Sequence, residues 1–158
     1  MLSGILTGAP IWVWPLLIVL IVLGVIASRD RTRLVMPMYF FWLLGAISLN
    51  AVSALAADAV VWVGFGLAYL VGAGLGFQFQ KTIIVRKFER QISMKGEWVT
   101  LVVLMAIFWM NFVGGIVQAI SPEAYGSFTY HIIFATVAGL VAGSFLGRSL
   151  RTFLTPMS

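Results

Sequence analysis

The residues able to do chemistry are few and lie in apolar surroundings. His131 is the only histidine, and the chain has no cysteine. A zinc or haem site needs further ligands of these kinds, so we expect no metal and no cofactor. Disulfides and iron–sulfur clusters are excluded for the same reason. Two roles remain open for His131: a hydrogen-bonded packing residue, or part of a polar or pH-sensing pocket.

Three amide side chains are the other polar candidates. Asn111 and Gln118 are seven positions apart, which places them on one face of a helix, and Asn50 lies in a different apolar run. If these faces converge on His131, the four side chains form a neutral polar pocket. Alternatively, the amides hydrogen-bond neighbouring helices, each contributing about 1 kcal/mol or less. Both interpretations stay open at this stage.

The sequence does not favour catalysis or ion-coupled transport. It contains no nucleophile–base set, carboxylate pair, phosphate-binding loop or zinc-ligand spacing. The long apolar runs also contain no Asp, Glu, Lys or Arg. Coupled transporters usually depend on ionisable groups inside the membrane. We therefore expect that the protein is not an enzyme.

The composition is that of a membrane protein. Hydrophobic residues make up 61% of the chain, charged residues make up 9%, and the mean hydropathy is +1.06. Soluble domains average about 25% charged residues. A membrane-crossing helix needs about 20 apolar residues. We predict an all-α integral membrane protein, a single transmembrane domain over residues 1–158. The five predicted spans are approximately 10–28, 34–55, 60–79, 98–120 and 128–147.

The distribution of charge predicts an orientation. With five spans, all ten Lys and Arg residues fall on one side, and the opposite segments carry Asp58 and Glu123. The positive-inside rule then places the N-terminus outside and the C-terminus inside. The basic side follows from this orientation and is no sign of nucleic-acid binding. Cations near a membrane attract anionic lipid head groups. The expected lipid-facing cations are Arg29, Arg31, Arg33, Arg86, Lys87, Arg90, Arg148 and Arg151.

Five of the ten Lys and Arg residues lie in one loop, residues 81–96, between the third and fourth spans. Within it, Phe88 and Ile92 alternate with polar residues, as in a half-buried strand. Together with Ile84, the same residues also make an i, i+4 row typical of an interfacial helix. We predict a short hairpin or an amphipathic turn on the cytoplasmic face.

The third and fifth spans carry small residues at every fourth position, a pattern that lets helix backbones approach closely in lipid. The two rows are Gly64, Ala68, Gly72, Gly76 and Ala135, Gly139, Gly143, Gly147. A constant shift of 67 positions superposes three pairs in these rows. This shift suggests that a helical hairpin is repeated, over 34–81 and 101–148.

Three further stretches carry a family resemblance. "SRDRTRLVMP", "GAGLGFQFQ" followed by a basic loop, and "KGEWVTLVVL" resemble small uncharacterised bacterial inner-membrane proteins related to the CcdC-like group, which is named after cytochrome c biogenesis. The resemblance covers about half of the chain. It implies a multi-pass bundle in the bacterial inner (cytoplasmic) membrane. It supplies no catalytic residues, and without a CxxC motif any cytochrome link would not use thiol chemistry.

Three functions are compatible with these patterns. The first is a non-catalytic accessory or assembly protein that packs through its glycine-rich helices. The second is a small oligomeric channel or uncoupled transporter with the polar pocket as its outer vestibule. The third is a lipid- or quinone-binding protein. The expected partners are the anionic bilayer and either a second copy of the chain or another membrane protein.

Overall fold

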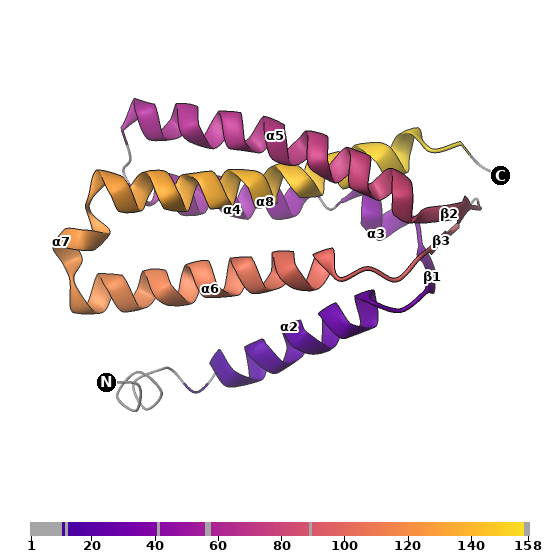
Figure 1. Ribbon diagram of the computed structural model, residues 1–158, viewed down its shortest axis with the longest axis horizontal. Helices are drawn as coiled ribbons and strands as arrows, with labels where there is room; N and C mark the ends of the chain where they lie inside the picture. Colours follow the sequence, from indigo (N-terminus) through magenta and orange to yellow (C-terminus); the bar gives the residue numbers. More distant parts are fainter. Residues whose placement is uncertain (1–10, 12, 41, 56–57, 89, 157–158) are drawn as a thin grey trace.

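The computed structural model describes residues 11, 13–40, 42–55, 58–88 and 90–156. Within them, the chain forms helices and one small sheet (Figure 1). The helices are α2 (Val13–Ala27), α3 (Met36–Tyr39), α4 (Trp42–Ser53), α5 (Ala59–Ile83), α6 (Val99–Ile120), α7 (Pro122–Tyr125) and α8 (Phe128–Leu154). The strands are β1 (Arg31–Leu34), β2 (Ile84–Lys87) and β3 (Gln91–Met94).

Three helices in the described part of the chain, α5, α6 and α8, are long and apolar enough to cross a membrane. They correspond to the third, fourth and fifth predicted spans. Helices α2 and α4 have 15 and 12 residues. At about 1.5 Å per residue, both are shorter than a hydrocarbon core of about 30 Å. The structure is therefore mostly helical with three helices of spanning length, and five crossings stay a prediction.

The second predicted span, 34–55, is not one continuous helix. Leu34 belongs to β1, and the backbone N–H of Val35 donates to the carbonyl of Arg90, 3.1 Å away, which ties this segment to the sheet. The chain then forms the short α3 before α4 begins. The hydroxyl of Ser149 in α8 donates to the carbonyl of Tyr39 at 2.8 Å. A side chain thus satisfies a backbone group that the interrupted helix leaves free.

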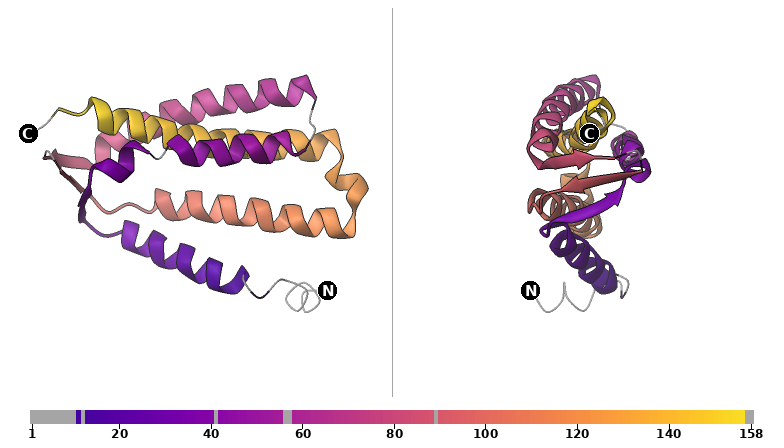
Figure 2. Two further views of the ribbon diagram at one scale, coloured as in Figure 1. Left: turned by 180° about the vertical axis from the view of Figure 1, so that it is seen from behind. Right: turned by 90° about the vertical axis from the view of Figure 1, so that its right-hand side faces the viewer.

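The loop between α5 and α6 forms a hairpin, which is one of the two predicted alternatives, and a third strand joins it. Strand β3 lies in the middle of the sheet and pairs antiparallel with both β2 and β1 (Figure 2). The pairing of Arg31 with Met94 brings the segment after α2 onto the hairpin. Strand β1 has no counterpart in the sequence predictions. The three-stranded sheet closes one end of the helix bundle.

Helix α8 is the centre of the bundle, and α5 is its main neighbour. Both helices run from the far end toward the sheet, so they pack in parallel (Figure 1). An added Cβ at Gly72 would meet the carbonyl of Leu140, and one at Gly76 would meet that of Ser144. From the other side, a Cβ at Gly143 would meet the carbonyl of Tyr69. These backbones are in direct contact because glycine leaves room for them.

The remaining small residues of the two rows lie along the same contact. Ala68 and Ala135 are buried, and Gly139 and Gly147 would place a Cβ against the backbone of α5. Gly64 lies next to the flexible end of Ile132. Beside this contact, α4 packs on α8. The repeat over 34–81 and 101–148 stays a prediction.

Helices α2 and α6 form a separate antiparallel pair, seen below the others in Figure 1. At Gly24, α2 touches the side chain of Leu101 in α6. α6 touches α8 much less than α5 and α4 do. The described residues therefore form two helical groups, and the sheet joins them at one end.

Candidate functional site

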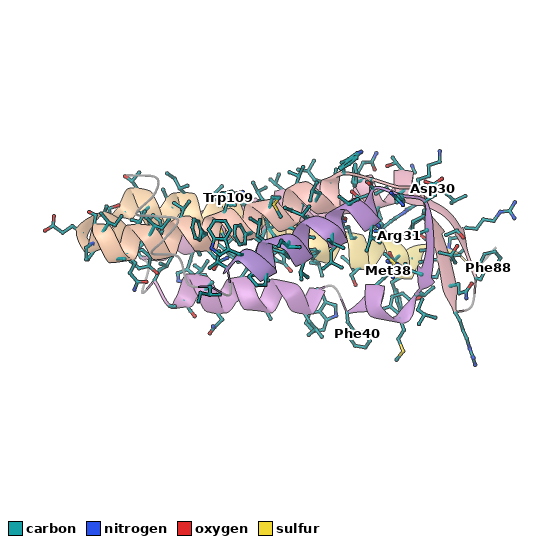
Figure 3. All side chains as sticks on the ribbon, turned by 90° about the horizontal axis from the view of Figure 1, so that it is seen from below. Asp30, Arg31, Met38, Phe40, Phe88 and Trp109 are labelled. Carbon is teal, nitrogen blue, oxygen red and sulfur yellow. The ribbon has the colours of Figure 1, made fainter. Side chains whose placement is uncertain are left out.

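A cavity of about 690 Å³ lies where the two helical groups meet the sheet. Leu23 and Ile26 of α2, Leu104 of α6 and Phe145 of α8 contribute apolar walls. The polar part of the lining is concentrated near the sheet. It consists mainly of Arg31, Thr32, Arg33, Gln80, Gln91, Glu97, Thr100 and Arg148. Figure 3 shows Arg31 and Met38, which also lines the cavity, at the sheet end of the molecule.

Glu97 is the carboxylate of this cavity, and it is held at the start of α6. Its side chain accepts a hydrogen bond from the N–H of Thr100 at 2.8 Å and a second one from the Thr100 hydroxyl. Its own N–H donates to the carbonyl of Ala27 at 2.9 Å. A carboxylate at a helix N-terminus also interacts favourably with the helix dipole. Glu97 therefore joins the end of α2 to the beginning of α6.

Gly96, just before Glu97, is needed for this junction. A Cβ there would meet the backbone carbonyls of Ser28 and Arg29. The N–H of Gly96 donates to Oδ1 of Asp30 at 2.7 Å. The two chain segments can approach this closely because residue 96 has no side chain.

Arg148 is the buried cation that faces Glu97. Its Nη1 lies 3.5 Å from Oε1 of Glu97, and both side chains are only 7% exposed. The same nitrogen donates to the hydroxyl of Thr100 at 3.0 Å. The guanidinium also lies over the ring of Phe79, 5.5 Å from its centre. Its Nε has no hydrogen-bond partner among the described residues, so Arg148 retains an unused donor.

Arg31 adds a second guanidinium to the cavity. Its Nη1 donates to the carbonyl of Ile26 at 3.0 Å. Burial lowers the pKa of Arg31, Glu97 acts against this decrease, and Arg33 adds to it. Arginine nevertheless remains protonated in proteins. Arg31 and Arg148 thus share one carboxylate.

A neighbouring set of polar contacts fixes the end of α8 to the sheet. The amide of Gln80 donates to the hydroxyl of Thr152 at 3.3 Å. Lys87 of β2 donates to the carbonyls of Thr152 and Thr155, each at 2.8 Å. A lysine at this position satisfies carbonyls that have no partner within the helix. These contacts are structural and hold α8 against the sheet.

Two of the eight cations predicted to face lipid head groups are not on the surface. Lys87 and Arg148 are each 6% exposed, because one caps α8 and the other pairs with Glu97. Arg31 and Arg151 are half-buried. The exposed ones are Arg29, Arg33, Arg86 and Arg90.

The four residues of the predicted polar pocket lie on three helices, α4, α6 and α8. Asn50, Asn111 and Gln118 are exposed, and His131 is half-buried beside Tyr130. The amide of Asn111 donates to the carbonyl of Ile107 in its own helix at 2.8 Å. Within the described residues, no hydrogen bond joins any two of the four side chains. The polar pocket stays a prediction.

Glu97 and Thr100 were not among the predicted site residues. The signal was an acidic residue at the end of a basic loop, immediately before an apolar run. Gln80 and Thr152 gave no signal of their own. Their pairing, over 72 positions, depends on how α5 and α8 pack.

Fold and cavity together define the class: over the described residues, a mostly helical protein with three helices of membrane-spanning length and a partly open cavity at one end. Within the described residues, no group of three or more His, Asp or Glu could hold a metal ion. The chain matches no protein-family model, no curated protein and no solved structure. The resemblance to the CcdC-like group therefore stays a prediction.

Proposed function

We propose that this chain is a non-catalytic accessory protein of the bacterial inner membrane that holds a lipid-like molecule in the cavity beneath its sheet. The proposal rests on the shape and lining of the cavity, which has apolar walls along the helices and polar groups at one end. Small-molecule sites typically combine such walls with a few polar groups that fix orientation. The volume, about 690 Å³, lies within the range of about 300–1,000 Å³ found for such sites.

The charge distribution supports the proposed orientation. The sheet, the ends of α5 and α8, and the segment after α2 carry the Lys and Arg residues, and they lie at one end of the molecule (Figure 1). Asp58 and Glu123 lie at the other end. By the positive-inside rule, the sheet end faces the cytoplasm and the N-terminus faces outward. The cavity then opens at the level of the inner leaflet.

An accessory role also accounts for the exposed apolar faces. Leu67, Leu70 and Leu75 of α5 are each more than 60% exposed. In a membrane such faces contact lipid, a second copy of the chain, or the helices of another membrane protein. We expect the protein to act within such an assembly.

The test is native mass spectrometry of the full chain, extracted gently from its own membrane, with bound lipid as the readout. Leu23→Trp fills the cavity from α2 and Leu104→Trp fills it from α6. Both variants should lose the co-purified lipid that the unmodified chain retains, because the added ring occupies the same volume.

The matched control is Leu70→Trp, an equally large change on α5 at a side chain that is 69% exposed and outside the cavity lining. It should retain the lipid. If both cavity variants keep as much lipid as this control, the cavity is not a lipid site and the proposal fails.

A further inference from the structure

The polar end of the cavity carries more positive than negative charge. Arg31, Arg33 and Arg148 line it together with one carboxylate, Glu97, which leaves an excess of two positive charges. Asp30, the neighbouring acid, accepts its hydrogen bond from the N–H of Gly96. Glu97 already accepts two hydrogen bonds from Thr100 and is paired with Arg148. Glu97 carries one negative charge, so it cannot neutralise a second guanidinium.

Arg148 carries a buried positive charge at the wall of the cavity. It is 94% buried, and burying a charge without full compensation is costly. One edge of its guanidinium, Nη1, is used by Glu97 and Thr100, and Phe79 lies against its face. The Nε lacks a partner within the described part of the chain, although Arg148 borders the cavity. This nitrogen is itself buried, so a ligand in the cavity meets the positive charge of Arg148 and reaches its Nε only if the side chain shifts.

The walls specify the rest of the ligand. Leu23, Ile26, Leu104 and Phe145 extend away from the arginines along α2, α6 and α8. A small free anion would leave these apolar surfaces uncovered. A molecule with an acidic head and a hydrocarbon tail would cover them and place its charge at the arginines.

We propose that the cavity binds an anionic phospholipid, with its phosphate at Arg31, Arg33 and Arg148 and its acyl chains along the apolar walls. This inference rests on the proposed function and names the ligand class of the same cavity. Guanidinium groups recognise phosphate oxygens through paired charge-assisted hydrogen bonds. Glu97 competes with the phosphate for Arg148 and so limits the affinity.

The experiment compares lipids on the purified full chain by native mass spectrometry. The probes are dioleoyl phosphatidylglycerol, the zwitterionic dioleoyl phosphatidylcholine and inorganic phosphate, each titrated separately. Phosphatidylglycerol should bind about tenfold more tightly than phosphatidylcholine, and inorganic phosphate should not displace it at millimolar concentration. If inorganic phosphate displaces the lipid, the site recognises free anions, and this inference is wrong.

Charge variants test the named residues. Arg31→Gln and Arg33→Gln should each weaken phosphatidylglycerol binding by about tenfold. Arg86→Gln is the matched control, because Arg86 is exposed on β2 and does not line the cavity. Glu97→Gln should strengthen binding several-fold, since it frees Arg148; a purely structural role for Glu97 would not give this gain. The melting temperature of each variant is measured to check that it remains folded.

The outcomes separate the two proposals. Suppose that the Trp variants abolish binding of both lipids while the charge variants behave like Arg86→Gln. The cavity then holds lipid without distinguishing its charge, and only this inference fails. If the Trp variants change nothing, the proposed function itself fails. Equal affinity for the two lipids in the unmodified chain also overturns the inference.

Discussion

The two helix pairs that border the cavity are built differently. Between α5 and α8, glycines bring backbone against backbone: a Cβ at Gly143 would lie 2.8 Å from the nitrogen of Ala73. Between α2 and α6, a Cβ at Gly24 would meet the side chain of Leu101 first and would lie 3.0 Å from its Cα, and α6 is the main helical neighbour of α2. Helix α8 packs against both α5 and α4, whereas α2 packs mainly against α6. One wall of the cavity is therefore fixed, and the other can shift to fit what it holds.

The largest effect is expected where the fixed wall is disturbed. Gly143→Ala should lower the free energy of unfolding by about 3 kcal/mol, because the methyl group must separate two backbones. Thermal unfolding in detergent measures this change. The control is Gly74→Ala in α5, where no atom lies within 4 Å of the added Cβ and no loss is expected. Equal stability of the two variants would show that the α5–α8 contact is not rigid.

The attachment of the fixed wall to the sheet should come next. Lys87→Met removes charge-assisted hydrogen bonds to the carbonyls of Thr152 and Thr155, at a cost of about 2 kcal/mol. Lys81→Met, at an exposed position of α5, is the matched control and should be neutral. Hydrogen exchange of the last turn of α8 should increase only in the first variant. Unchanged exchange there would contradict the capping role.

The link between the adjustable wall and the sheet is weaker. Asp30→Ala removes the acceptor for the N–H of Gly96, at an exposed position where water can replace it. We expect a cost of about 1 kcal/mol. Asp58→Ala is the comparison, since the Asp58 side chain makes no capping hydrogen bond at the start of α5. A loss as large as that of Lys87→Met would mean that both walls are held equally firmly.

The smallest effect is expected at the α2–α6 contact itself. Gly24→Ala adds a methyl group against the side chain and Cα of Leu101. Because α6 is the main helical neighbour of α2, we expect α2 to shift away from it. The greater helix propensity of alanine offsets part of the strain, so the net change should be less than about 1 kcal/mol. If Gly24→Ala destabilises the protein as much as Gly143→Ala, the contrast between the two walls is wrong.

Only part of this fold could be predicted from the sequence. Apolar length alone identified α5, α6 and α8, and the alternation around Ile92 indicated the hairpin, because these signals are local. Strand β1 was missed because its four residues gain strand geometry only by pairing with β3. The break after Tyr39 was missed for a similar reason, since its partner, Ser149, is 110 positions away.

The cavity itself could not be predicted from local patterns. Glu97 and Arg148 are far apart in the chain, and their pairing follows from the positions of α6 and α8 at the sheet. The sequence placed Arg148 beyond its span, at the lipid surface. In the structure α8 continues to Leu154, which brings Arg148 inside the bundle. Long-range packing decides this difference.

The parallel pairing of α5 with α8 has a consequence for how the protein is made. Gly72 of α5 packs against Leu140 of α8, and the ribosome adds Leu140 68 residues after Gly72. At about 5–20 residues per second, the delay is about 3–14 s. During that time α5 lacks its main neighbour, and its glycine face is not yet covered by α8. The α5–α8 contact can therefore form only after α8 itself has been made.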